Sequence, residues 1–123
     1  MKPLGPLAGK TILIIGEADF LADNARGALI ANQASVTGPI VASDAMDRLS
    51  EGLIVDAVII DIAISDDAML WMNEWLEARK IPFIFARDQQ SAGLPGGFVL
   101  SGRPADINAI VFALFGQERP FYH

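Results

Sequence analysis

The chain has 123 residues, 52% of them hydrophobic, with a net charge of −6, no cysteine and a single histidine at the last position, His123. This length suits one domain with its own hydrophobic core. The lack of cysteine excludes disulfides, thiolate metal sites and cysteine nucleophiles, and a lone terminal histidine argues against histidine acid–base catalysis in a pocket. An acidic pI near 4.5 argues against nucleic-acid binding.

Predicted strands and helices alternate along the chain. Short apolar runs predict strands at residues 11–15, 35–37, 55–60, 81–86 and 98–100. Helical spacing of apolar residues predicts one helix over about 20–32, one from Ser43 to Gly52, one from Asp66 or Asp67 to about residue 79, and one after Pro104 that ends at Gly116. Asp19 and Ser43 are the expected N-caps of the first two helices. Residues 91–97 are rich in glycine and proline, so any helix there is short or absent.

This alternation predicts right-handed βαβ units and a parallel sheet. In such a sheet a site lies beyond the carboxyl ends of the strands. Five residues map to that edge: Gly16, Glu17, Asp61, Arg87 and Arg103. One glycine after the first strand is too few for a dinucleotide-binding turn, so a nucleotide-binding enzyme is rejected.

The pattern resembles the phosphoacceptor receiver domains of bacterial two-component response regulators, as an atypical member. The resemblance covers residues 10–116 and leaves tails at 1–9 and 117–123. The residues that carry it are Ile12-Leu13-Ile14-Ile15-Gly16-Glu17, Thr37-Gly38-Pro39, Asp56-Ala57-Val58-Ile59-Ile60-Asp61, Ile81-Pro82-Phe83-Ile84-Phe85 and Arg103-Pro104-Ala105-Asp106. It implies a flavodoxin-like, doubly wound five-stranded parallel sheet in the order 2-1-3-4-5, with the fourth helix short or missing.

The resemblance also implies roles for particular residues. Asp61 stands at the phosphoacceptor position, and Ala63 would supply the family's backbone carbonyl ligand to magnesium. The family's acidic pair is reduced to Gly16 and Glu17, so one acid is lost and the other is a methylene longer. Magnesium is therefore expected to bind weakly or not at all, through Glu17, Asp61 and Ala63, and no other cofactor is expected.

Two arginines replace the family's other site residues. Arg87 stands in place of the threonine or serine that senses the phosphoryl group, and Arg103 stands in place of the lysine before proline. Two carboxylates and two arginines would make the pocket neutral without metal, so we expect Arg87, Arg103 or both to pair with Asp61. Replacing Arg87 by threonine and Gly16 by aspartate would then restore metal binding.

These observations predict a stand-alone signalling module of a phosphorelay, not an enzyme, with Asp61 as a slow phosphoacceptor. The alternative is a pseudo-receiver that binds proteins and is not phosphorylated. The implied partner is a histidine kinase, a phosphotransfer protein or another signalling protein. Contact with a second copy or with another partner is expected through the fifth strand and last helix, where Phe112 and Phe115 add apolar surface. No apolar run approaches the roughly 18 residues that a membrane span needs, and no secretory signal opens the chain, so the expected location is the cytoplasm.

Overall fold

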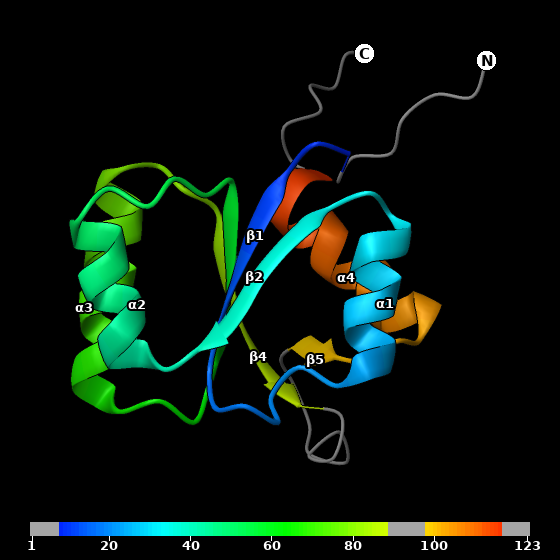
Figure 1. The fold of residues 1–123 in the computed structure, drawn as a ribbon, viewed down its shortest axis with the longest axis horizontal. Helices are drawn as coiled ribbons and strands as arrows, with labels where there is room; N and C mark the ends of the chain where they lie inside the picture. Colours follow the sequence, from blue (N-terminus) through cyan, green and yellow to red (C-terminus); the bar gives the residue numbers. More distant parts are fainter. Residues whose placement is uncertain (1–7, 89–97, 117–123) are drawn as a thin grey trace.

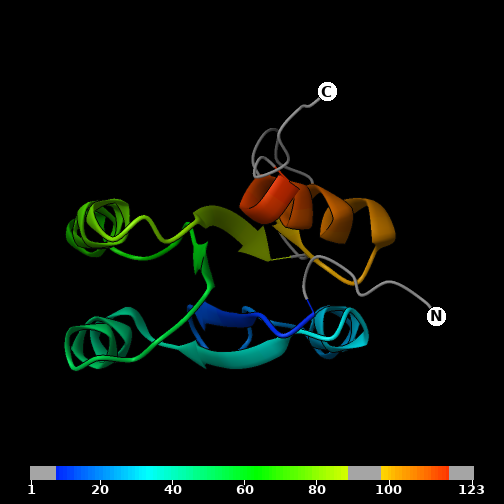
Figure 2. The ribbon, with the colours of Figure 1, turned by 90° about the horizontal axis from the view of Figure 1, so that it is seen from above.

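A computed structural model describes residues 8–88 and 98–116 of the chain. It has a five-stranded parallel sheet in the order β2-β1-β3-β4-β5, as the sequence predicts. Two helices cover each face, with α2 and α3 on one side and α1 and α4 on the other (Figures 1 and 2). The strands are β1 (Thr11–Ile15), β2 (Ser35–Ile40), β3 (Ala57–Asp61), β4 (Phe83–Asp88) and β5 (Phe98–Leu100); the helices are α1 (Asp23–Ala31), α2 (Ala42–Ser50), α3 (Asp66–Ala78) and α4 (Pro104–Phe115).

The central strands are apolar on both sides because helices cover both sides of the sheet. Successive side chains of β1 point to opposite faces, so Ile12 and Ile14 join the core beneath α1 and α4, while Leu13 and Ile15 join the core beneath α2 and α3. The same alternation divides Ala57 to Ile60 of β3, all of them fully buried. The two cores hold β1 and β3 in the middle of the molecule, which fixes the position where each strand ends.

The helix starts differ from the expectations at three places. Helix α1 begins at Asp23 rather than near residue 20, with Ala22 and not Asp19 as its N-cap. Helix α2 has Val41 as its N-cap in place of Ser43. For α3 the cap is Ser65, whose hydroxyl accepts a hydrogen bond from the Ala68 amide at 3.1 Å, so Asp66 and Asp67 lie inside the first turn. Negative charge is favoured there by the helix dipole.

The end of α2 agrees with the sequence. Gly52 has a φ of +107°, and its amide donates to the Leu49 carbonyl while Leu53 donates to Arg48. This pair of hydrogen bonds is a Schellman motif, in which glycine is preferred because it adopts positive φ without strain.

Strand boundaries also differ. Strand β2 does not stop before Gly38-Pro39 but continues to Ile40, with an irregular register against β1 between Leu13 and Ile15. Gly38 permits this because its φ is +109° and a Cβ there would collide with the Ile14 carbonyl oxygen. Strand β3 begins two residues later than expected, at Ala57, and β4 runs to Asp88 rather than Ala86. Arg87 is therefore a strand residue.

Strand β5 and helix α4 have the boundaries that the sequence predicts. The prediction of a short or missing fourth helix at residues 91–97 lies outside the described residues, as do both expected tails apart from Ala8 and Gly9. Within residues 8–88 and 98–116, no helix is long and apolar enough to cross a membrane.

Candidate functional site

The ends of β1 and β3 open on a hollow of about 290 Å³ at the carboxyl edge of the sheet. Its lining comes from the segments that follow β1, β2 and β3: Gly16, Glu17, Val41, Ala42, Ser43, Asp61, Ala63, Ile64 and Ser65. The three residues that the sequence assigns to a metal site, Glu17, Asp61 and Ala63, therefore share one cavity.

Asp61 is the last residue of β3 and is half-buried. Its Oδ1 accepts a hydrogen bond from the Ala63 amide at 2.9 Å, and its backbone carbonyl accepts from Ile64 at 3.3 Å. A side chain that bonds to the backbone two residues ahead is typical of an aspartate that opens a turn. The turn holds the carboxylate at the cavity while leaving it open to solvent.

The oxygen donors around the cavity suit a magnesium ion. Magnesium takes hard oxygen ligands and is commonly held by one or two carboxylates together with phosphate and water. Glu17, which is exposed, and Asp61 supply two carboxylates, and Ala63 supplies a carbonyl. The part of the chain that the structure describes contains no group of three or more acidic, histidine or cysteine side chains placed to hold a metal. The donor set thus fits a loosely held cation, which would offset the charge of the two carboxylates.

Gly16 stands where the resemblance implies a second acid, and it is buried. A Cβ built on it would lie 2.9 Å from Cδ2 of Phe20 and 3.0 Å from Cβ of Asp61. The first distance is shorter than packed carbon atoms show, and the second is tighter than most carbon contacts. The position is therefore closed to any side chain unless Phe20 moves.

The expectation that an arginine pairs with Asp61 is wrong for the residues that the structure describes. Arg103 lies three residues beyond the end of β5, and its side chain is 73% exposed. It pairs instead with Asp106, at 3.7 Å between Nε and Oδ2. Neither Arg103 nor Arg87 has a hydrogen bond or ion pair to Asp61 among the described contacts. The pocket is therefore not neutralised by these arginines.

Arg87 lies within β4 rather than after it, opposite Val99 of β5. Asp61 is opposite Ala86, and side chains alternate along a strand, so Arg87 points to the other face of the sheet from Ala86. Arg87 is half-buried and makes contacts of its own.

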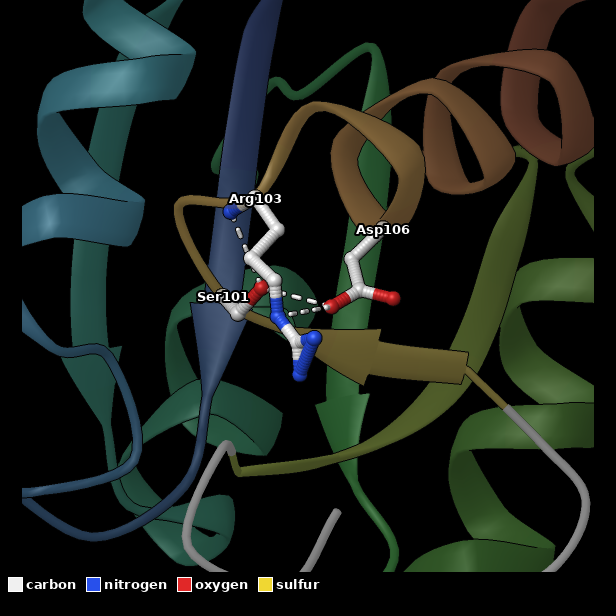
Figure 3. A network of polar contacts seen from close by, with 3 residues as sticks. All are labelled: Ser101, Arg103 and Asp106. Atoms are coloured by element: carbon white, nitrogen blue, oxygen red, sulfur yellow. Dashed lines mark hydrogen bonds and ion pairs between the residues drawn. The ribbon is translucent and has the colours of Figure 1, made fainter.

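Ser101 is the residue that the sequence interpretation missed. It follows β5 directly and is only 2% exposed. Its hydroxyl donates to Oδ2 of Asp106 at 2.7 Å and accepts from the Arg103 amide at 3.1 Å, as Figure 3 shows. Counting from the strand end would have indicated it, because Ser101, not Arg103, is the first residue after the predicted fifth strand.

Gly102 fixes the path between Ser101 and Arg103. A Cβ on Gly102 would lie 2.9 Å from the backbone oxygen of Asn24 in α1. The loop after β5 therefore passes close against α1, and Arg103 is carried on to the N-cap of α4. Ser101, Asp106 and Arg103 thus form a network of polar contacts at the N-terminal end of α4.

No protein-family model and no curated protein match this chain. Solved structures do. The chain is similar to SdrG from Pseudomonas melonis Fr1, a response-regulator receiver domain in its BeF3-activated conformation, with 22% identity and a TM-score of 0.63 over 87% of this chain and 97% of that one. It is also similar to a chain described as a yeast Spc42 trimeric coiled coil fused to another structure, with 19% identity and a TM-score of 0.50, over 85% of this chain and 63% of that one. At these identities the likeness shows the fold, which is the flavodoxin-like fold of receiver domains.

Proposed function

We propose that this protein is a receiver-like signalling module of a two-component phosphorelay, in which Asp61 accepts a phosphoryl group slowly. The proposal is supported chiefly by the position of Asp61, at the end of the central strand β3 and in one cavity with Glu17 and Ala63. SdrG, which has the same fold, takes an activated conformation with BeF3, and trifluoroberyllate mimics a phosphoryl group on a carboxylate.

In the proposed reaction a carboxylate oxygen of Asp61 attacks the phosphorus of a phosphohistidine. The new bond joins this oxygen to phosphorus, and the phosphorus–nitrogen bond breaks and returns its electron pair to the imidazole. Such transfer depends on positioning and on charge stabilisation around the phosphoryl oxygens. Here the stabilising groups are few, since Arg103 is turned to Asp106 and no third acid supports a cation. Slow transfer is the expected consequence.

The proposed partner is the donor of that group, a histidine kinase or a phosphotransfer protein. We expect no nucleic-acid partner, because the net charge of −6 would repel phosphates. The proposed location is the cytoplasm, where such donors present their phosphohistidine. The chain is proposed to act through protein contacts rather than as an enzyme.

A pseudo-receiver that is never phosphorylated is the second candidate. It is favoured by the contacts at the β5 side of the site, where Arg103 pairs with Asp106 and Ser101 is held by two hydrogen bonds. With these contacts kept, neither side chain would follow a phosphoryl group on Asp61. In this case the protein would keep the receiver surface for binding and lose the chemistry.

Mass spectrometry separates the two candidates. The wild-type protein is incubated with a small phosphodonor such as acetyl phosphate and magnesium, and the peptide that contains Asp61 is followed over time. We expect slow, partial labelling that is lost in Asp61→Asn. Rapid stoichiometric labelling would contradict the slow transfer, and no labelling by either acetyl phosphate or a phosphorylated phosphotransfer protein would favour the pseudo-receiver.

We also propose that the protein self-associates through β5 and α4. Strand β5 is at one edge of the sheet, and Phe112 of α4 is 69% exposed. Phe115 does not contribute, contrary to the expectation, because it is buried in the core at 7% exposure. Light scattering at high concentration should detect a dimer that Phe112→Ser abolishes. A wild-type protein that stays monomeric would exclude this contact.

A further inference from the structure

The segment after β1 folds tightly against the acceptor. The Phe20 amide donates to the Glu17 carbonyl at 3.0 Å, which closes a turn over residues 17–20. The turn brings the side chain of Phe20 back onto Gly16, which directly precedes the turn. Gly16 is thereby enclosed, with Phe20 and Asp61 on the side where its side chain would lie.

Phe20 cannot easily move away from this place. It is 2% exposed and belongs to the core beneath α1 and α4, together with Leu21, Ala25 and Leu29. The interior of a protein is close-packed, so a displaced ring would force these neighbours to shift as well. Packing in the core therefore fixes the position of Phe20 against Gly16.

We propose that Gly16 and Phe20 are a size-matched pair that limits the cation site to two carboxylates. The aromatic ring of Phe20 takes the volume that a side chain at position 16 would enter, so a third carboxylate is excluded by packing and not only by the identity of residue 16. A third negative charge beside a divalent cation would strengthen its binding substantially. The pair thus determines how weakly the site holds its cation, which deepens the proposed function.

The pair also changes the result expected for Gly16→Asp, the substitution that the sequence analysis expects to help restore metal binding. Gly16→Asp places a Cβ 2.9 Å from Cδ2 of Phe20 and 3.0 Å from Cβ of Asp61, so the first carbon of the new side chain already crowds its neighbours. Adding aspartate alone is therefore expected to strain the core instead of building a ligand. Phe20→Leu removes part of the ring while keeping an apolar side chain in the core.

The test uses the wild type, Gly16→Asp, Phe20→Leu and the double variant, without any phosphodonor. Magnesium affinity is measured by calorimetry, manganese affinity by paramagnetic resonance of the free ion, and stability by the thermal midpoint. We expect Gly16→Asp to melt lower and to bind no tighter than the wild type. The double variant should melt higher than Gly16→Asp and bind either ion about tenfold more tightly than the wild type.

A second pair of variants tests the packing without any new charge. Gly16→Ala should lower the thermal midpoint, and Phe20→Leu should reduce that loss in the combined variant, because only the added Cβ is at stake. A Gly16→Ala protein as stable as the wild type would overturn the proposal, as would Gly16→Asp alone binding cations as tightly as the double variant. Since no phosphoryl transfer is measured, these outcomes are independent of whether Asp61 is phosphorylated.

Discussion

The two halves of the carboxyl edge are built differently. The Asp61 half, made of Glu17, Asp61 and Ala63, lies around an open cavity, and its one side-chain hydrogen bond among the described contacts runs from the Ala63 amide to Asp61. The β5 half, made of Ser101, Arg103 and Asp106, is closed on itself: Ser101 is buried, and its hydroxyl joins the other two residues. One half remains available to ligands, and the other supports the start of α4.

The two halves of this edge are therefore physically separable. Nothing in the turn that holds Asp61 depends on Arg103 or Ser101, since its hydrogen bonds run within residues 61–64 and to Ala86 of β4. The residues after β5 can therefore change their contacts while Asp61 stays in place. We expect stability to depend strongly on the β5 half and weakly on the Asp61 half.

The largest expected effect is that of Ser101→Ala. Removing this hydroxyl leaves the Arg103 amide and a carboxylate oxygen of Asp106 without their partner, and an unmade buried hydrogen bond costs about 1–3 kcal/mol. Chemical denaturation should show a loss of this size in the free energy of unfolding. Ser43→Ala is the matched control, because Ser43 is exposed and caps no helix, and it should change stability by less than about 0.5 kcal/mol. Equal effects of the two variants would break the comparison.

A smaller effect is expected for Asp106→Asn. Asp106 lies in the first turn of α4, where a negative charge interacts with the helix dipole by about 0.3–1 kcal/mol. The amide can still accept from Ser101, so only the charge is lost. Unfolding measured at low and high salt should show a loss that shrinks as salt rises. Arg103→Gln changes the exposed partner of the ion pair and should lower the free energy of unfolding by less than Asp106→Asn does. A larger loss for Arg103→Gln would mean that the ion pair stabilises this half more than the charge at the helix start does.

The smallest effect on stability is expected for Asp61→Asn. The substituted side chain keeps an oxygen that can accept from the Ala63 amide, and the residue is half-buried at an open cavity. The free energy of unfolding should change by less than about 0.5 kcal/mol, while phosphoryl labelling should be lost completely. A large destabilisation would show that the Asp61 half also supports the fold.

Much of the fold could be read from local pattern. Strands β1, β3 and β5 were recognisable as short continuous apolar runs, because helices cover both faces of the sheet, and α4 was recognisable from the helical spacing of its apolar residues. Helix starts were less reliable. Asp19, Ser43 and Asp66 are all good capping residues. The observed N-caps are nevertheless Ala22, Val41 and Ser65. Residue type alone therefore locates a helix start only to within a few residues.

For the site, local pattern was sufficient to identify the residues at the ends of β1 and β3, and so to bring Glu17, Asp61 and Ala63 to one edge. The alternation of strands and helices and the handedness of their connections place these strand ends together. The arrangement of the β5 half depends on tertiary contacts. The close approach of Gly102 to Asn24 carries Arg103 away to Asp106, and the ring of Phe20 closes the space beside Gly16. The first result comes from a contact between segments distant in sequence, and the second from a segment that folds back on itself. In both cases the neighbouring atoms determine which way a side chain can point, and residue type alone does not.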